Sequence, residues 1–348
     1  MSEGAGVQIL TTAQVALDLG LPIHGIIALT HMAADKLGGS IPSPGRGLLS
    51  VARQCNHLDP SSLLDHSLRR RRINLSQQHV QIHENLELSM LDNEIQAREA
   101  QGEVLGTKYR LESERRIGEM TQREKRSIVR NMGNFFWKGD STVSPLAGAL
   151  ASFGLSVEDL SIASFHGTST VLNDVNECNV VNLQLRHLEK KPGRPIYTVF
   201  QKSLTGHSLG AAGAWMLNGA LQMLHSGLIP GNRNVDNVES KLAQCEHLFF
   251  LNRNIQLPDH LIKAISLTSF GFGQKGAQAL LIHPRYLYAA ISSKRYEEYH
   301  TVYTRRCQQA NETFNGRMRQ RTLVTRKLEP PYRKDETATL LDPCARYG

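Results

Sequence analysis

Two histidines that each follow a short apolar segment are the feature that most constrains what this chain can fold into. His166 follows the apolar residues 161–165, and His207 comes shortly after the apolar residues 195–200. Each histidine stands beside a glycine, where backbone or a ligand can approach closely. The pattern predicts two strand ends that deliver polar groups to one place, because sites on open α/β sheets collect at the carboxyl ends of strands.

The segments that follow these histidines alternate between helix and strand patterns. Residues 173–188 are predicted to form a helix with Asp174 and Glu177 in its first turn, where negative charge suits the helix dipole. His207 opens a second helix, whose apolar side chains recur at three- and four-residue steps until Gly227. Two more apolar strands are predicted at residues 264–268 and 277–282. The sequence therefore predicts an α/β fold.

The first third of the chain contains a different pattern. Residues 6–20 carry spaced apolar positions and end in a glycine, which predicts a helix with a glycine C-cap. Residues 23–29 form a short apolar run that predicts a buried strand, and residues 38–47 form a loop rich in Gly, Pro and Ser. Residues 61–130 are charged and rich in helix-forming residues, so we expect an insertion of one or two long, mostly exposed helices.

The composition is that of a cytoplasmic globular protein. The chain has 348 residues, 40% hydrophobic and 21% charged, and has neither an apolar run of membrane-spanning length nor a secretory signal pattern at its start. Its five cysteines are scattered without metal-like spacing, which favours reduced thiols. We therefore expect a cytoplasmic protein that does not bind a membrane.

The basic surplus lies mostly in the tail. The net charge is +8, and residues 294–334 alone hold eleven Lys or Arg against four Asp or Glu. A second basic cluster occupies residues 69–72. Either cluster could meet nucleic acid or an acidic protein, but no nucleic-acid motif accompanies them. We therefore interpret both as solvated or partner-facing surfaces and expect no nucleic-acid partner.

The residue types around the two histidines suit carbonyl chemistry. Two neutral imidazoles can donate hydrogen bonds to an oxygen that gains negative charge, and Lys202 could hold one of them and add positive potential. The turn SFGFGQKG could supply a backbone N–H to the same oxygen. The alternative for the turn is a glycine hairpin with two phenylalanines in the core. The alternative for the histidines is a metal site, but the sequence offers no third ligand at a suitable spacing.

Three motifs, HGTST, KxxxxGH and SFGFG, resemble those of the β-ketoacyl synthases, the condensing enzymes of the thiolase fold. Longer stretches are similar to the ketoacyl synthase domains of fungal fatty acid synthase α subunits. These stretches are FQKSLTGHSLGAAGAWMLNGALQ, PGNRNVDN, TSFGFGQKGAQ, the segment from EGAGVQ through SIPSPGRGLLSVAR, and NFFWKGDSTVSPLAGAL. The likeness covers about residues 3–58 and 130–290 and is weaker elsewhere. It implies a layered α-β-α-β-α thiolase-like fold with an incomplete first half and a long helical insertion.

The resemblance also implies roles for the motif residues. His166 and His207 match the two catalytic histidines, and Lys202 matches the lysine of the second motif. The backbone N–H of Phe272 matches the oxyanion donor, and its ring matches the gate of the acyl tunnel. The remaining implied site residues are Thr168, Thr170, Phe270, Gly271 and Gly273 for substrate binding, with Asp174 and Glu177 as structural support.

The family also needs a cysteine nucleophile on a sharp elbow, which precedes the segment matching EGAGVQIL. This chain begins just before that segment, so we expect the nucleophile and the first part of the fold to be absent from it. Cys178 is the cysteine nearest to His166 in sequence, but it falls inside a predicted helix, and attack needs an exposed, activated thiolate. The basic tail after Pro330 departs from the family as well, because the family continues there into a carrier-modifying domain.

The resemblance implies a β-ketoacyl-acyl carrier protein synthase of fatty acid biosynthesis, in a truncated or nucleophile-less form. The implied reaction is the decarboxylative Claisen condensation of acyl and malonyl thioesters. The alternative is a non-catalytic assembly subunit of a fatty acid synthase complex. The implied substrate handle is the phosphopantetheine arm of an acyl carrier protein, with no tightly bound cofactor and no metal. The implied partners are the acyl carrier protein, other fatty acid synthase subunits and a second copy that pairs through the thiolase-like fold.

These expectations divide the chain into four segments. They are the remainder of the first thiolase-like half (1–58), the charged helical insertion (59–134), the half with both histidine motifs (135–290) and a basic tail (291–348).

Overall fold

The computed structural model describes residues 1–35, 44–103, 107–233, 235–271, 273–324 and 335–342. The chain divides into two compact units, one formed by Met1–Leu10 with Ile23–Ala290 and the other by Thr11–Pro22 with Ile291–Gly348. Within the described residues, no helix combines the length and the hydropathy that a membrane span requires.

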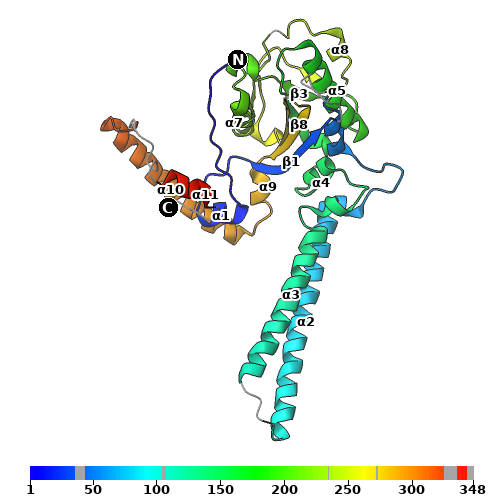
Figure 1. Ribbon diagram of the computed structural model, residues 1–348, viewed down its shortest axis with the longest axis vertical. Helices are drawn as coiled ribbons and strands as arrows, with labels where there is room; N and C mark the ends of the chain where they lie inside the picture. The colour runs from blue at the N-terminus through cyan, green and yellow to red at the C-terminus, as the bar shows by residue number, and fades with distance from the viewer. Residues whose placement is uncertain (36–43, 104–106, 234, 272, 325–334, 343–348) are drawn as a thin grey trace. The chain divides into compact units, whose positions relative to one another are not determined.

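A six-stranded mixed sheet lies at the centre of the first unit, in the order β1-β8-β7-β2-β3-β5 (Figure 1). Strand β2 runs parallel to both β3 and β7, while β7, β8 and β1 are joined antiparallel. Because β2 and β3 are adjacent and parallel, their carboxyl ends meet at one edge of the sheet. The strands are β1 (Ile26–Ala34), β2 (Leu160–Ser164), β3 (Ile196–Val199), β5 (Leu248–Phe250), β7 (Ala264–Gly271) and β8 (Lys275–Ile282), and a separate pair is formed by β4 (Leu228–Ile229) and β6 (Ile255–Gln256).

Helices cover both faces of this sheet. Successive strand residues point to opposite faces, so Ile162 belongs to one hydrophobic cluster and Ala163 to another. Helix α7 packs on the side of Ile162, whereas α4, α5 and the 3₁₀ helix η1 pack on the side of Ala163. Figure 1 shows α5 and α7 on opposite sides of the strands. The helices of these layers are η1 (Arg46–Ala52), α4 (Pro145–Ala151), α5 (Val171–His187), α6 (Lys202–Thr205), η5 (Leu209–Ala211), α7 (Ala212–Ser226), α8 (Ser240–Ala243) and α9 (Arg285–Tyr288).

Two predictions for the first 30 residues are wrong. The helix predicted from residue 6 is only α1 (Ala13–Asp18), because residues 2–8 lie against the His207 loop and α7. The strand predicted at residues 23–29 is β1, which starts later and runs to Ala34 in register with β8. It is an edge strand in which only Leu29 is buried, so the expected full burial is also wrong.

The two long helices predicted for the charged region are confirmed. They are α2 (His66–Ala100) and α3 (Thr107–Met132), which pack against each other as an antiparallel hairpin. The Asp65 carboxylate caps α2 by accepting from the Leu68 N–H at 2.9 Å. Between the helices, Arg110 pairs with Asp92 at 2.7 Å and Lys125 with Glu84 at 3.6 Å.

A buried arginine attaches the start of this hairpin to the body of the first unit. Arg69 is 3% exposed, and its guanidinium donates to the carbonyl oxygens of Leu63 at 2.5 Å and Ala151 at 2.7 Å. The same group lies 4.4 Å from the centre of the Phe136 ring, in a cation–π arrangement. Burial lowers the pKa of Arg69 below its ordinary value, so the two carbonyl partners compensate a real desolvation cost.

The second unit is built around α10 (Ser293–Arg319). Tyr299 on this helix is 3% exposed and donates its hydroxyl to the Leu21 carbonyl at 3.0 Å. Arg295 pairs with Asp18 at the end of α1. A short helix, α11 (Glu336–Leu341), follows.

Replacing Arg69 with methionine should destabilise the first unit, because the Leu63 carbonyl loses its guanidinium donor and the Ala151 carbonyl keeps only the Gly154 N–H. We expect Arg69→Met to lower the free energy of unfolding by about 1–3 kcal/mol, the usual cost of one unsatisfied polar group. Urea unfolding followed by circular dichroism measures this. The matched control is Arg71→Met on the same helix, where the side chain is exposed; equal losses for the two variants would contradict the anchoring role.

Candidate active site

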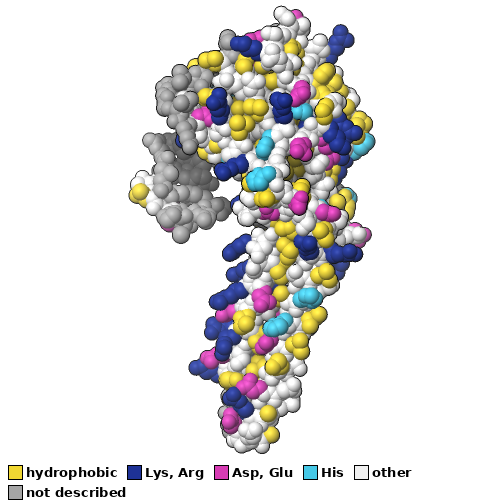
Figure 2. Space-filling view, turned by 90° about the vertical axis from the view of Figure 1, so that its right-hand side faces the viewer, with side chains coloured by type: hydrophobic (Ala, Val, Ile, Leu, Met, Phe, Trp, Pro, Cys, Tyr) yellow, Lys and Arg dark blue, Asp and Glu magenta, His cyan; other side chains and the backbone are white. Residues whose placement is uncertain are grey.

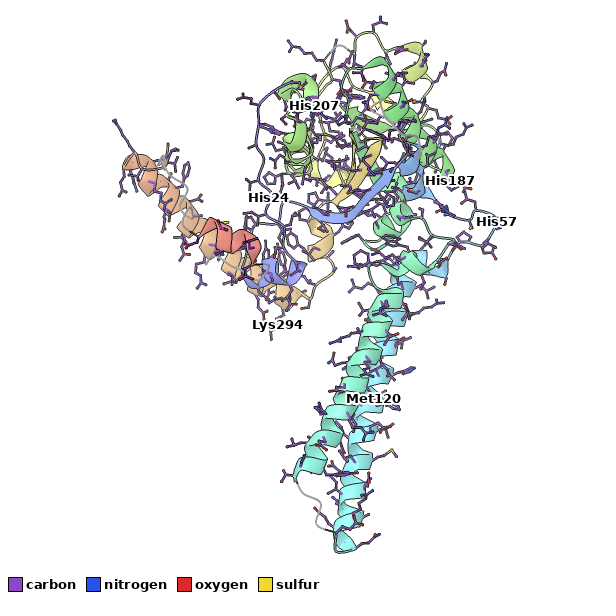
Figure 3. All side chains as sticks on the ribbon, in the orientation of Figure 1. His24, His57, Met120, His187, His207 and Lys294 are labelled. Atoms are coloured by element: carbon purple, nitrogen blue, oxygen red, sulfur yellow. The ribbon has the colours of Figure 1, made fainter. Side chains whose placement is uncertain are left out.

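The ends of β2 and β3 bring three of the predicted site residues together. His166 stands two residues after β2, and Lys202 opens α6 three residues after β3. The ring centres of His166 and His207 lie 5.1 Å apart, with the rings nearly perpendicular at 86°. His207 itself lies beside the start of α7 (Figure 3). These are the two strand ends at which the sequence predicted a shared site.

His166 is buried, and its Nδ1 faces two hydrogen-bonding groups. The Lys202 ammonium and the Ser269 hydroxyl each lie 3.2 Å from this nitrogen. Burial, with the positive charge of Lys202 and the neighbouring His207, lowers the pKa of His166 to about 3. The imidazole is therefore neutral at physiological pH. Since a protonated lysine can only donate, it places the ring proton on Nε2.

His207 reaches the same protonation state by a local contact. Its Nδ1 accepts the Leu209 backbone N–H at 3.1 Å, which leaves Nε2 to carry the proton. Gly206 precedes it with a φ of +69°, a conformation that only glycine adopts without strain, and this turn carries the chain from α6 into η5. Partial burial and the charge of Lys202 lower the pKa of His207.

Lys202 uses all three of its donors inside the protein. It is 9% exposed, and its Nζ contacts the His166 Nδ1, the His166 carbonyl at 2.5 Å and the Met216 sulfur at 3.3 Å. Burial lowers the pKa of Lys202 to about 8, against the opposing charges of Glu177 and Asp174. The ammonium is thus mostly charged at neutral pH but loses its proton a little above it.

Two carboxylates from the first turns of α5 hold the loop that carries His166. Glu177 is fully buried and accepts the backbone N–H of His166 at 2.7 Å and of Gly167 at 3.0 Å. The Thr268 hydroxyl donates to it as well. Burial raises the pKa of Glu177 to about 7, although these donors and Lys202 act in the opposite direction.

The other acidic residue, Asp174, holds the next part of the same loop. Its carboxylate accepts from the backbone of Ser169 and Thr168, while burial raises its pKa. The hydroxyls of Thr168 and Thr170 lie 3.2 Å apart, and Thr170 is exposed. Thr168 is partly exposed and Thr170 is exposed on the loop that follows His166.

The β7–β8 hairpin supplies one side chain to the site. Ser269, in β7, contacts His166 from 103 residues further along the chain. Gly271 ends β7, and Gly273 forms the turn with a φ of +73°. Phe270 is 6% exposed and lies in the hydrophobic core, where a Cβ on Gly45 would come within 2.2 Å of its ring, so its ring has a packing role. Phe272 lies outside the described residues.

Several residues around the site were not predicted from the sequence. Gln201 donates its amide to the Ser164 hydroxyl at 2.9 Å and to the Met216 carbonyl at 3.0 Å, which ties α6 to β2 and α7. Ser269 and Thr268 had no predicted role either. The only available signal was their position beside motif residues, because their partners lie far away in the sequence.

An extended segment, residues 2–8, lies along the loop that carries His207. The Ser2 N–H donates to the His207 carbonyl at 3.0 Å, and the Gln8 amide donates to the Asn218 side chain at 2.7 Å. A Cβ on Gly6 would lie 2.6 Å from the Ala214 Cβ, so only glycine permits this approach. We call residues 2–8 the strap, and it restrains the backbone of His207 from outside.

Within the described residues, the Cys178 thiol is not placed to act as a nucleophile, and no cluster of side chains is arranged to bind a metal ion. Cys178 is fully buried in α5, and burial raises the pKa of its thiol far above neutrality, so it stays protonated. Among the residues that the structure describes, no three His, Cys, Asp or Glu side chains are arranged to hold a metal ion.

A larger side chain at Gly6, where the strap lies closest to α7, should make the His207 ring more accessible to reagents. We expect Gly6→Val to lift residues 2–8 from α7, because the added carbons would overlap Ala214. The rate of His207 acylation by diethyl pyrocarbonate, located by mass spectrometry, should then rise several-fold. The control is Gly213→Ala, where a new Cβ meets no atom within 4 Å; an unchanged rate in Gly6→Val would show that the strap does not restrain this histidine.

Comparison with known proteins agrees with this arrangement. Residues 129–236 match the family model of the β-ketoacyl synthase C-terminal domain. The chain is 45% identical over 349 aligned residues to a fatty acid synthase subunit alpha of Emericella nidulans, covering 98% of this chain and 21% of that protein. It is 46% identical to the fatty acid synthase apf5 of Gibberella fujikuroi, covering 99% of this chain and 22% of that protein. The chain thus spans about a fifth of the length of these curated relatives.

A solved structure extends the comparison to the fold. The noncanonical ketosynthase FabY of P. aeruginosa superposes with a TM-score of 0.53 at 17% identity, covering 89% of this chain and 34% of that one. At this identity the likeness concerns the fold alone, which is the thiolase-like fold of ketosynthases. Together with the sequence matches, it shows that the chain belongs to the β-ketoacyl synthase family and corresponds to the ketosynthase region of fungal fatty acid synthase α subunits.

Proposed function

We propose that this chain supplies the histidine half of a β-ketoacyl synthase site, which condenses an acyl and a malonyl thioester in fatty acid synthesis. One observation carries the proposal: the ring centres of two neutral imidazoles lie 5.1 Å apart, and each ring has its Nδ1 engaged. Both Nε2–H groups are therefore left as donors. Two such donors suit an oxygen that gains negative charge during a reaction.

The proposed chemistry uses both donors on one oxygen. His166 and His207 bind the thioester oxygen of the malonyl group through their Nε2–H groups. The bond to the carboxylate carbon breaks, carbon dioxide leaves, and the electron pair moves onto that oxygen as an enolate. The enolate carbon then attacks the acyl thioester, a new carbon–carbon bond forms, and the thiolate leaves. Neither histidine gains or loses a proton in these steps.

The thiolate in this scheme belongs to a cysteine outside these residues. The chain spans about a fifth of its relatives, which are fatty acid synthase subunits, so the rest of such a protein would supply the nucleophile. We propose that the malonyl and acyl groups arrive on the phosphopantetheine arm of an acyl carrier protein. We assign the hydroxyls of Thr168 and Thr170, which lie 3.2 Å apart, to binding the amides of that arm. Phe272 keeps its proposed role as the oxyanion donor.

A purely structural assembly role is the alternative, and the site argues against it. An assembly surface does not need a buried lysine whose pKa is lowered to about 8. It also does not need an almost fully buried histidine with a free Nε2–H. Such groups are expensive to bury and are typical of functional sites.

Removing either histidine should greatly slow malonyl decarboxylation. The assay supplies malonyl thioester to this chain together with the upstream part of the synthase as a separate polypeptide, and measures the release of carbon dioxide. We expect His166→Ala and His207→Ala each to lower the rate by about 10²–10³-fold, the usual cost of one oxyanion donor. The control is His79→Ala on α2, which is exposed and lies outside the site.

The outcome that would contradict the proposal is specific. If His166→Ala and His207→Ala released carbon dioxide as fast as His79→Ala, the two imidazoles would not stabilise the enolate. If the unchanged chain gave no product with any upstream partner, the assembly role would be favoured.

Lys202 should determine the alkaline limb of the pH profile. Below about pH 8 its ammonium can only donate to the His166 Nδ1, which keeps the ring proton on Nε2. Above that pH the neutral amine can also accept, so the ring proton is no longer held on Nε2 and the rate should fall. On the acid side the rate should fall only below pH 6.5, because the pKa of His207 is lowered from that value. Lys202→Met should therefore slow the reaction and remove the alkaline limb. An alkaline limb that persists in Lys202→Met would assign it to another group.

A further inference from the structure

The three hydrogens of the Lys202 ammonium meet acceptors of unequal strength. Figure 2 shows many Lys and Arg side chains on the surface of the molecule, where water can bind them. Lys202 is only 9% exposed, so its hydrogens need acceptors inside the protein. Two acceptors belong to His166, its carbonyl at 2.5 Å and its Nδ1 at 3.2 Å. The third is the Met216 sulfur at 3.3 Å, and a thioether is a weak acceptor.

The position of this sulfur is determined by contacts of the site itself. Met216 lies in α7 and is 2% exposed. The Gln201 amide donates to the Met216 carbonyl at 3.0 Å and to the hydroxyl of Ser164, the last residue of β2, at 2.9 Å. A Cβ on Gly219 would lie 2.1 Å from the Gln201 Oε1, so glycine at this position leaves room for the amide. The end of β2 and the turn of α7 that carries the sulfur are therefore held by one side chain.

Packing alone does not require a sulfur atom at this position. The buried face of α7 contains Met216, Ala220, Met223 and Leu224, and all four belong to one hydrophobic cluster. Leucine and methionine replace each other in cores at little cost. Met223 is 3% exposed on the same face, and its sulfur has no hydrogen-bond partner among the described residues. The two methionines thus share an environment but differ in their contact with the lysine.

The ammonium also faces charged and polar groups from four parts of the fold. These are Glu177 and Asp174 on α5, the neutral rings of His166 after β2 and His207 before η5, and the Ser269 hydroxyl on β7, which shares the His166 Nδ1. The two carboxylates raise the pKa of Lys202, whereas burial lowers it to about 8. The acceptor of the third hydrogen acts beside these charges, because a hydrogen bond to the charged form favours that form.

We propose that Met216 is a positioning residue, whose sulfur accepts the third hydrogen of the Lys202 ammonium without drawing the ammonium away from His166. An oxygen acceptor in its place would hold the ammonium more strongly, whereas a hydrocarbon would leave one N–H without a partner. The two replacements should therefore move the pH at which His166 loses its fixed tautomer in opposite directions. The effect on the rate rests on the proposed function, but the contact and its first test do not.

Nitrogen-15 NMR of the whole chain with labelled histidine tests this role directly. The ring shifts of His166 report which nitrogen carries the proton, and His166→Gln identifies its signals among those of the 14 histidines. In the unchanged chain the tautomer should change near pH 8, where Lys202 loses its proton. Met216→Leu should lower this midpoint by about 0.5–1 pH unit, and Met216→Gln should raise it by a similar amount, as expected for one weak hydrogen bond to a charge.

The matched control is Met223→Leu, which removes a sulfur from the same cluster and should leave the midpoint unchanged. Equal midpoints in Met216→Leu and Met223→Leu would overturn the proposal, because the Met216 sulfur would then have no effect on the lysine. Shifts of the same sign in Met216→Leu and Met216→Gln would overturn it as well, since they would reflect altered packing. If circular dichroism shows that Met216→Gln does not fold, the comparison of the two leucine variants decides alone.

The release of carbon dioxide separates this inference from the proposed function. With the upstream polypeptide present, the alkaline limb of the rate should move by the same amounts and in the same directions as the tautomer midpoint. If the midpoints move as expected but the unchanged chain releases no carbon dioxide, the proposed function fails and the role of Met216 stands. A limb that moves in Met216→Leu while the tautomer midpoint does not would overturn that role.

Discussion

The buried carboxylate of Glu177 is the interaction on which the rest of the site depends. It lies in α5 but accepts the backbone N–H groups of His166 and Gly167, after β2, and the hydroxyl of Thr268, in β7. A fully buried carboxylate is costly unless its oxygens are hydrogen-bonded, so the charge is tolerated only while all three donors are in place. One side chain thus couples a helix and two strands, and the position of His166 follows from that coupling.

The neighbour of His166 is a lysine, and this determines the protonation state of the imidazole. A carboxylate at the Nδ1 of an imidazole would raise its pKa and favour the cation, whereas the ammonium of Lys202 lowers it. Burial acts in the same direction on both His166 and His207. The result is a pair of neutral rings that donate hydrogen bonds but do not exchange protons near neutral pH. Such a pair suits the stabilisation of an oxyanion better than general acid–base catalysis.

The sequence predicted the parts of this arrangement that follow from local order. An apolar run followed by His166, and another followed by Lys202, already implied two strand ends, and adjacent parallel strands then bring them together. The path of residues 2–8 could not be predicted in this way, because it depends on contacts with α7 more than 200 residues away. Ser269 was missed for the same reason: its contact with His166 spans 103 residues.

The hairpin and the site are joined through α4 rather than directly. Arg69 binds the carbonyl of Ala151 at the end of α4, and α4 packs in the hydrophobic cluster that also contains the buried face of α5. The exposed apolar side chains of α2, Leu75, Ile82, Leu86 and Met90, do not belong to that cluster. Substitutions on surfaces that share no partners are usually additive. A change at Ile82 should therefore leave the chemistry at His166 unaltered, whereas a change at Arg69 disturbs the packing that supports both the hairpin and the site.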